Sequence, residues 1–242
     1  MTQNKSVWES EEVAKAFIEN ERGAIPGNDI QLAIILKAVQ HWHDNPRTIM
    51  DLGCGNGIIG KYLLASYPES RGVFIDISDT MLESAGENLE KFPDSEIIKG
   101  DLSSAAWLEV IDKNKPVDLV ISGFAIHHLT DQRKKELYME IYEILSPGGI
   151  FLNLDHVESA STGVENLFEQ YYIDHLHNFQ QSYDPGVKRE TVEKIYQERP
   201  DKDEDKPVMV DIQCDWLRDI GFKDVDCFFK LFVIALFGGR KV

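Results

Sequence analysis

The chain has 242 residues, of which 43% are hydrophobic, enough to bury a full core in one α/β domain or in a domain with a modest insertion. Its 42 acidic and 25 basic residues give a formal net charge of −17. Because such a surface repels phosphate backbones and anionic lipid, these values argue against nucleic acid and against a membrane as the main partner.

The sequence contains no feature typical of export or of membrane insertion. The opening residues MTQNKSVWESEE lack the apolar core of a secretion signal, and the most apolar run, residues 228–237, is too short to span a bilayer. The three cysteines, Cys54, Cys214 and Cys227, are far apart and form no C-x-x-C pair. This spacing argues against a disulfide framework and a zinc site, and we expect a cytoplasmic protein.

The apolar patterns predict helices first and then strands that alternate with helices. Residues 1–45 form an N-terminal cap with amphipathic helices predicted at 8–20 and 28–43. Strands are predicted at residues 47–52, 72–77, 96–99, 117–122 and 149–155, and helices at 58–66, 78–91, 103–111 and 131–145. Ser78 or Asp79 would cap the second of these helices, and Thr130 or Asp131 the last. Such alternation is typical of parallel βαβ units, so the predicted fold class is a doubly wound α/β sheet.

The end of the chain departs from this alternation. A helix is predicted to end at residues 216–220, and residues 224–239 have the pattern of two adjacent strands. Residues 157–209 are helical, aromatic and charged, and we expect them to form a helical lid inserted over the sheet. The mixed charge run at residues 198–207 is interpreted as a solvated loop. The core would then comprise residues 46–156 and 210–242.

The glycine-rich segment DLGCGNGIIG, residues 51–60, follows the first predicted strand and opens a helix. Counted from Gly55 it contains G-x-G-x-x-G, typical of a dinucleotide-binding turn, and counted from Asp51 it is D-x-G-x-G-x-G. A dinucleotide would place an anionic pyrophosphate beside the Asp51 carboxylate, which is unfavourable. S-adenosylmethionine (SAM) has no phosphate and carries a sulfonium and an ammonium group, so the acid favours SAM.

Two further acids lie at the ends of the next strands. Asp76 ends the second strand, at the spacing from the glycines at which a carboxylate can accept both ribose hydroxyls. Asp101 follows the third strand, where an acid can meet the adenine amino group while Leu102 packs on the ring. Acids after three consecutive strands support the binding of a nucleoside at the carboxyl edge of the sheet.

With these motifs the chain resembles the class I SAM-dependent methyltransferases of the small-molecule, type 11/12-like kind. DLGCGNG, VFIDIS and IIKGDL match the first three motifs of that family, VDLVISGFAIHHL its fourth strand and LSPGGIFLNLD its fifth. The resemblance implies a Rossmann-like seven-stranded sheet of five parallel strands and a C-terminal antiparallel pair, with SAM as cofactor. The residues implied in SAM binding are Asp51, Gly53, Cys54, Gly55, Gly57, Asp76, Ile77, Asp101, Leu102, Ser122 and Gly123.

Candidate catalytic residues lie just beyond the fourth and fifth strands. They are His127, His128, Asp155 and His156. A general base is needed only if the acceptor must lose a proton before methyl transfer, and in similar proteins the histidine segment mostly lies along the cofactor. The paired histidines also raise the question of a metal ion, but the sequence identifies no third convergent ligand, so we expect none.

The acceptor is expected to meet aromatic residues of the cap and lid. The best candidates are Trp8, Tyr171, Tyr172 and His175. We expect methyl transfer to oxygen or nitrogen of a small organic acceptor, by a monomer or homodimer. The alternatives are a protein or RNA methyltransferase, and a SAM-binding protein that acts without methyl transfer, as a sensor or assembly partner, or in other SAM chemistry. The exit of the fourth strand, Ser-Gly-Phe-Ala, differs from the (Asp/Asn)-Pro-Pro-(Tyr/Phe) segment of enzymes that methylate amide or base nitrogens.

Overall fold

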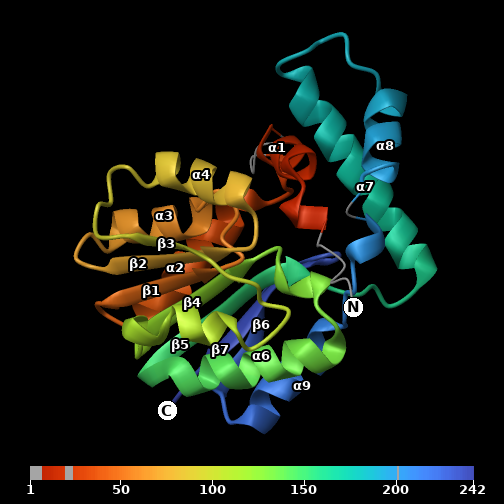
Figure 1. The fold of residues 1–242 in the computed structure, drawn as a ribbon. Coiled ribbons are helices and arrows are strands. Elements are labelled where there is room, and N and C mark those ends of the chain that lie inside the picture. The colour runs from red at the N-terminus through yellow and green to blue at the C-terminus, as the bar shows by residue number, and fades with distance from the viewer. Residues whose placement is uncertain (1–6, 20–23, 201) are drawn as a thin grey trace, which may run out of the picture.

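A single mixed sheet organises the protein (Figure 1). The computed structural model describes residues 7–19, 24–200 and 202–242, and within these ranges seven strands pair in the order β3-β2-β1-β4-β5-β7-β6. β1 to β5 are parallel, and β7 runs antiparallel to β5 and β6. The strands are β1 Thr48–Leu52, β2 Arg71–Asp76, β3 Glu96–Lys99, β4 Val117–Gly123, β5 Leu145–His156, β6 Lys223–Leu231 and β7 Ile234–Arg240. The predicted Rossmann-like sheet with its C-terminal antiparallel pair is confirmed.

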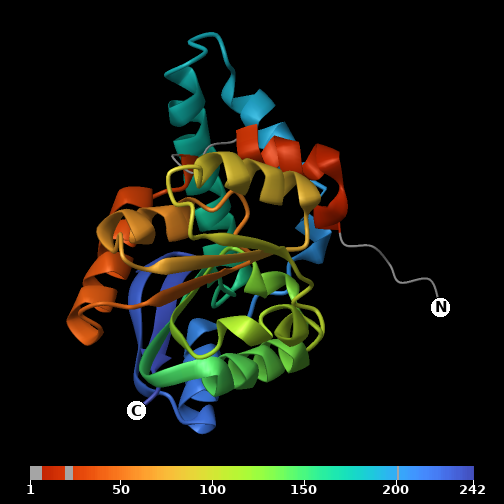
Figure 2. The same ribbon diagram turned by 60° about the vertical axis from the view of Figure 1, so that its left-hand side comes forward.

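Helices cover both faces of this sheet and create two apolar cores (Figure 2). One layer contains α2 Asn28–Trp42, α3 Ile58–Ser66 and α4 Asp79–Asn88, and the other contains α5 Trp107–Val110, α6 Asp131–Ile144 and α9 Val210–Ile220. Strands covered on both faces need apolar side chains in succession, which explains runs such as residues 73–75. Within the described ranges, none of the helices has the length and apolar character needed to cross a bilayer.

Side-chain caps decide where several helices begin. Ser78 Oγ accepts a hydrogen bond from the backbone N–H of Met81 at the start of α4, and Thr130 caps α6 in the same way. The predicted helix at 103–111 is shorter in the structure, only residues 107–110. The reason is that Asp101 binds both the backbone N–H and the hydroxyl of Ser103, which holds that stretch as a turn.

The first part of the predicted N-terminal cap and the lid lie beyond one end of the sheet. This part of the cap contains η1 Val7–Glu9 and α1 Glu11–Glu19, whereas α2, also within the predicted cap, packs on one face of the sheet, and residues 1–6 and 20–23 lie outside the described residues. The lid contains α7 Thr162–Gln181, α8 Arg189–Gln197 and η5 Lys202–Glu204. α7 and α8 lie side by side (Figure 1), and α1 packs against η1 and α4.

The two ends of the lid are neighbours in space. The backbone N–H of Glu158 donates to the carbonyl of Val208, across 3.3 Å, and the N–H of Val157 donates to Val233 at the turn between β6 and β7. The chain therefore leaves the sheet and returns to it at almost the same place. Between these points, α7 packs on the same turn through the rings of Phe168 and Phe232, whose centroids are 5.6 Å apart.

Gly238 allows β7 to lie close against β5, and this close approach gives a test of the fold. A Cβ added at Gly238 would lie 2.0 Å from the carbonyl oxygen of Phe151 and 3.0 Å from Leu152 Cα, both backbone atoms that cannot move independently. We expect Gly238→Ala to lower the free energy of unfolding by roughly 1–3 kcal/mol, the cost of overpacking, measured by urea denaturation.

Gly86→Ala is the matched control, because Gly86 is exposed within α4 and a Cβ there would meet only Ile97 at 3.8 Å. Alanine is the better helix former, so this variant should be as stable as the original protein or up to about 1 kcal/mol more stable. Equal stability of both variants would contradict the proposed close approach.

Candidate active site

A cavity of about 1750 Å³ lies at the carboxyl ends of the parallel strands. Its floor is formed by the segments that follow β1 to β5, and its roof by η1, α7, α8 and the residues after α8. In open α/β sheets this edge is the usual ligand-binding position, near the point where strand order reverses. Here β1 lies between β2 and β4, so the reversal falls beside the glycine-rich loop.

The glycine-rich loop brings its backbone against this cavity. Gly53, Gly55 and Gly57 all have positive φ, at 64°, 53° and 77°. Gly53 is the most constrained of them, because an added Cβ would lie 2.2 Å from Ala125 Cβ. At the end of β1 the carboxylate of Asp51, which is 1% exposed, accepts a hydrogen bond of 3.0 Å from the N–H of Gly60. The loop therefore presents backbone and a buried acid to the cavity, without a bulky side chain.

Asp76 links the end of β2 to the same loop. Its Oδ2 accepts from the N–H of Gly55 at 2.8 Å, and its Oδ1 accepts from the N–H of Ser78 at 2.9 Å. Burial raises the pKa of Asp76 above its usual value, while these N–H donors act in the opposite direction. Each carboxylate oxygen has a second lone pair, so Asp76 can still accept a hydroxyl from the cavity side.

Most of the predicted SAM-binding residues meet in this cavity. The residues that line it are Asp51, Gly53, Cys54, Gly55, Asp76, Ile77, Asp101, Leu102 and Gly123. Two predicted residues lie outside the lining: Gly57 is the N-cap of α3, and Ser122 is buried with its hydroxyl donating to the carbonyl of Leu52 at 2.7 Å. The individual contacts to SAM stay predictions. The acids at the ends of β1, β2 and β3 are all part of the lining.

The predicted catalytic residues form a buried cluster beside the cofactor wall. His127 Nδ1 lies 2.5 Å from Asp155 Oδ1, and Asp155 also accepts hydrogen bonds from the N–H of His156 and from Asn153 Nδ2. His127, His128 and His156 line the cavity, whereas Asp155 lies behind His127 and is 1% exposed. Asp155 is therefore placed to orient His127 and has no direct access to an acceptor.

Charge and burial move the pKa values of the two adjacent histidines in opposite directions. Burial by itself would lower the pKa of His127, but Asp155 and Asp205 outweigh it and raise the value to about 9. Burial, together with the charge on His127, lowers the pKa of His128 to about 3. A general base is most effective when its pKa is near the working pH, so neither histidine is well suited to that role at neutral pH.

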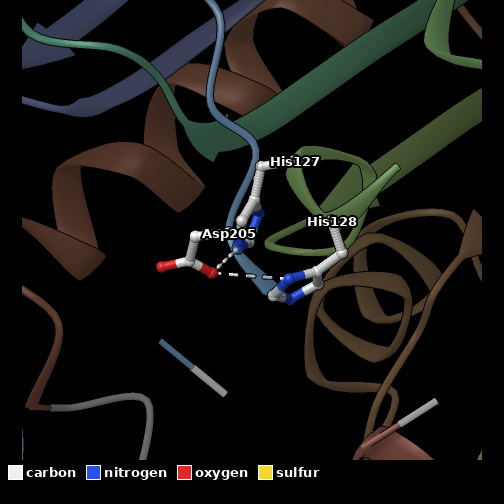
Figure 3. Close-up of side chains that lie close together, drawn as sticks. All are labelled: His127, His128 and Asp205. Carbon is white, nitrogen blue, oxygen red and sulfur yellow. Dashed lines mark ion pairs between the residues drawn. The ribbon is translucent and has the colours of Figure 1, made fainter. Parts of the chain in front are cut away.

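Asp205 completes the cluster and is the residue that the sequence interpretation missed (Figure 3). It belongs to the charge run that we interpreted as a solvated loop, yet its side chain is only 11% exposed. The next residue fixes it in place: the N–H of Lys206 donates to the carbonyl of His127, and Lys206 Nζ donates to the carbonyl of His128, each at 3.0 Å. Buried Lys134 in turn donates to the carbonyl of Lys206.

The predicted acceptor-binding residues divide into two groups. Trp8 and Tyr172 line the cavity, and the ring of Trp8 lies 5.2 Å from that of His128. Tyr171 and His175 are not part of the lining. On α7 the cavity instead meets Phe168, Tyr172 and Leu176. These residues recur every four positions and therefore lie on one face of the helix. This spacing in the sequence could have distinguished the face that lines the cavity from the opposite face.

Comparison with known proteins agrees with this geometry. Residues 49–149 match the methyltransferase domain family. This match agrees with the predicted resemblance to the class I SAM-dependent methyltransferases. SAM is the methyl donor of this family. The matched region begins in β1 and ends in β5, so it contains every strand end that borders the predicted SAM site.

Individual relatives share different parts of the chain. A malonyl-[acyl-carrier protein] O-methyltransferase of Halalkalibacterium halodurans is 29% identical over 45% of this chain and 39% of its own length. A ribosomal RNA large subunit methyltransferase G of Shewanella woodyi is 30% identical over 43% of this chain and 26% of its own length. The chain thus spans less than half of the length of these two relatives.

Two other proteins are similar over more of the chain. A carboxy-S-adenosyl-L-methionine synthase of Pseudoalteromonas atlantica is 22% identical over 92% of this chain and 88% of its own length. The solved structure of an O-methyltransferase family protein from Burkholderia thailandensis superposes with a TM-score of 0.63 at 16% identity, covering 94% of this chain and 59% of that one. The structural likeness concerns the fold.

The predicted ribose contact of Asp76 can be tested by substitution. Asp76→Ala should weaken SAM affinity by roughly 1–3 kcal/mol, because the ribose hydroxyls would lose their buried partner. Isothermal titration calorimetry measures the change, and circular dichroism checks the fold, since Asp76 also accepts two backbone N–H groups.

Asp79→Ala is the control for this variant. Asp79 lies three residues further along, and its side chain is 72% exposed and is not part of the cavity lining, although Lys99, with which it pairs, is. It should leave SAM affinity unchanged. If Asp76→Ala binds SAM as tightly as this control, the assignment of Asp76 to the ribose is wrong.

Proposed function

We propose that this protein transfers the methyl group of SAM to an oxygen or nitrogen atom of a small organic acceptor. The observation that carries the proposal is that one cavity is lined both by the glycine-rich loop and by the aromatic face of α7. Its volume of about 1750 Å³ exceeds the roughly 300–1000 Å³ of a typical single-ligand pocket, which leaves room for SAM and an acceptor together.

The walls of the acceptor end support a small, partly apolar acceptor. They include Phe168, Tyr172 and Leu176 of α7, Ile195 and Tyr196 of α8, and Trp8 from the N-terminal side. Aromatic walls with a few polar groups are typical of small-molecule pockets. The net charge of −17 disfavours a ribosomal RNA acceptor, although one relative acts on RNA by its name.

Methyl transfer from a sulfonium requires chiefly the alignment of acceptor, methyl carbon and sulfur. The lid supports this requirement, because α7 and α8 cover the acceptor end of the cavity while the glycine-rich loop and Asp76 lie at the cofactor end.

A second candidate is another reaction that modifies SAM. It is favoured by the similarity to the carboxy-S-adenosyl-L-methionine synthase, which extends over 92% of this chain and includes the lid. The two candidates differ in their product, because methyl transfer converts SAM to S-adenosylhomocysteine whereas a synthase of that kind leaves a heavier derivative of SAM.

Incubation with methyl-labelled SAM and a cell extract tests the proposal. We expect the label to move to a component of low molecular mass, with an equal amount of S-adenosylhomocysteine formed, and we expect Asp76→Ala to reduce the rate at limiting SAM. Mass spectrometry of the nucleoside products is run on the same samples.

Each other outcome identifies a different function. Label in RNA or protein, removed by ribonuclease or protease, would contradict the small-molecule acceptor. A heavier SAM derivative without S-adenosylhomocysteine would favour the second candidate. Tight SAM binding with neither product in any extract would contradict both and favour a sensor or assembly role.

A further inference from the structure

The cluster around Asp205 brings together three side chains that could bind a metal ion. His127 and His128 lie on the short helix η4, Ile126–His128, directly after β4, and Asp205 comes from the chain that returns from the lid (Figure 3). One nitrogen of each histidine and one carboxylate oxygen lie within 4.8 Å of one another. Neutral imidazole and carboxylate are the ligands that first-row divalent transition metals prefer.

The two distances from Asp205 to the histidines match the distance between neighbouring ligands of one ion. Asp205 Oδ1 is 3.3 Å from His127 Nε2 and 3.4 Å from His128 Nδ1. An ion bound tetrahedrally at about 2.0–2.1 Å from N and O ligands holds neighbouring ligand atoms about 3.4 Å apart. These pairs are also long for charge-assisted hydrogen bonds, which are usually about 2.7–2.9 Å.

Surrounding residues fix the orientation that metal binding needs. Asp155 occupies Nδ1 of His127 at 2.5 Å, so Nε2 of the same ring faces Asp205. A carboxylate behind a histidine is the usual outer partner of a metal-ligating imidazole. On the other side, Arg199 donates to Asp205 Oδ2 at 3.2 Å, while Oδ1 faces the two histidines.

Three atoms of the cluster are buried without a hydrogen bond. Within the part of the chain that the structure describes, both ring nitrogens of His128 and Oδ1 of Asp205 are covered and lack a hydrogen-bond partner. Buried polar atoms are nearly always satisfied, and exceptions call for a missing ion, water or ligand. Here the unsatisfied oxygen faces both His127 and His128, so one ion would satisfy it together with a nitrogen of His128.

We propose that His127, His128 and Asp205 bind one divalent transition-metal ion, such as Zn²⁺, Mn²⁺ or Fe²⁺. Two nitrogens and one oxygen disfavour Mg²⁺ and Ca²⁺, which prefer all-oxygen ligands. We expected no metal because the sequence identified no third ligand, and Asp205 supplies that third ligand. His156 lies beside the site, with Nδ1 3.7 Å from Asp205 Oδ2.

Three protein ligands leave at least one coordination position open, and all three residues line the cavity that also contains the glycine-rich loop. The open position therefore suits an oxygen donor of the methyl acceptor, such as a hydroxyl or carboxylate group. This part rests on the proposed function, whereas binding of the ion does not.

Metal binding is tested on the full chain without a histidine tag, first stripped with a chelator and then titrated with Co²⁺, Zn²⁺, Mn²⁺ and Mg²⁺ in the absence of SAM. We expect about one Co²⁺ or Zn²⁺ per chain by elemental analysis, a visible Co²⁺ absorption typical of nitrogen and oxygen ligands, and a rise in melting temperature with Zn²⁺ but not with Mg²⁺.

Variants assign the ion to this cluster. Loss of a residue that only hydrogen-bonds to a metal ligand usually weakens metal binding by roughly 10–100-fold. Asp155→Asn removes such a positioning residue, so it should weaken binding within that range and alter the Co²⁺ spectrum. His128→Gln and Asp205→Asn remove ligands and should weaken binding by more. His175→Gln and Asp131→Asn are the matched controls, because His175 lies outside the cavity and Asp131, although close in sequence, is 64% exposed. Both control variants should bind the metal ion as tightly as the wild-type protein does.

Two results would overturn the proposal. One is that the wild-type protein binds no transition-metal ion and that its melting temperature does not change with Zn²⁺. This measurement does not depend on whether any variant folds. The other is an ion retained with unchanged affinity and spectrum in folded His128→Gln and Asp205→Asn. Because neither measurement uses SAM or an acceptor, a failure here leaves the methyl-transfer proposal to its own assay.

Discussion

Parallel strands place their carboxyl ends at the same edge of a sheet, and in this protein three of those ends hold buried aspartates: Asp51, Asp76 and Asp155. A buried carboxylate is costly unless it is paired or hydrogen-bonded. Asp51 and Asp76 are stabilised by backbone N–H groups of the glycine-rich loop and of the start of α4, and Asp155 by His127. The carboxyl edge of the sheet is therefore acidic beside the glycine-rich loop, whereas at β5 the charge of Asp155 is balanced by the imidazole ring of His127.

This division of charge gives the cavity two chemically different ends. The end beside Asp51 and Asp76 offers carboxylates and backbone, which suits a cationic nucleoside such as SAM. The other part of the lining offers the ring nitrogens of His127 and His128 and the aromatic side chains of α7. A donor and an acceptor of different character can thus occupy one space without competing for the same groups.

The sequence predicted the sheet well, and most of the residues proposed to bind SAM line one cavity, because both depend on local patterns. The bounds of α3, Ile58–Ser66, and of β3, Glu96–Lys99, agree with prediction to the residue. Strand periodicity, glycines that need positive φ and acids at strand ends are all visible over a few neighbouring positions. Ser122 shows the limit of this approach, because its hydroxyl faces Leu52 on the adjacent strand, a partner 70 positions away.

The acceptor end was harder to predict because it depends on contacts between distant segments. A run as charged as residues 198–207 usually stays in solvent, and nothing within it reveals that Lys206 binds the carbonyls of His127 and His128, residues almost 80 positions earlier. On α7, aromatic composition alone did not separate Tyr171 and His175 from Tyr172, whereas the four-residue spacing of Phe168, Tyr172 and Leu176 does.

The hydrogen bond between Glu158 and Val208 joins the two ends of the lid, so the lid can be exchanged for another segment without changing the sheet. Because the segment leaves and rejoins the sheet at nearly one point, its length and sequence can change while the strands, the glycine-rich loop and the acids keep their places. Evolution, or a protein engineer, can then replace the helices that meet the acceptor while retaining the machinery for the donor. Asp205 and Lys206 limit which lid sequences can be exchanged. They lie within the lid, but they contact residues of the core.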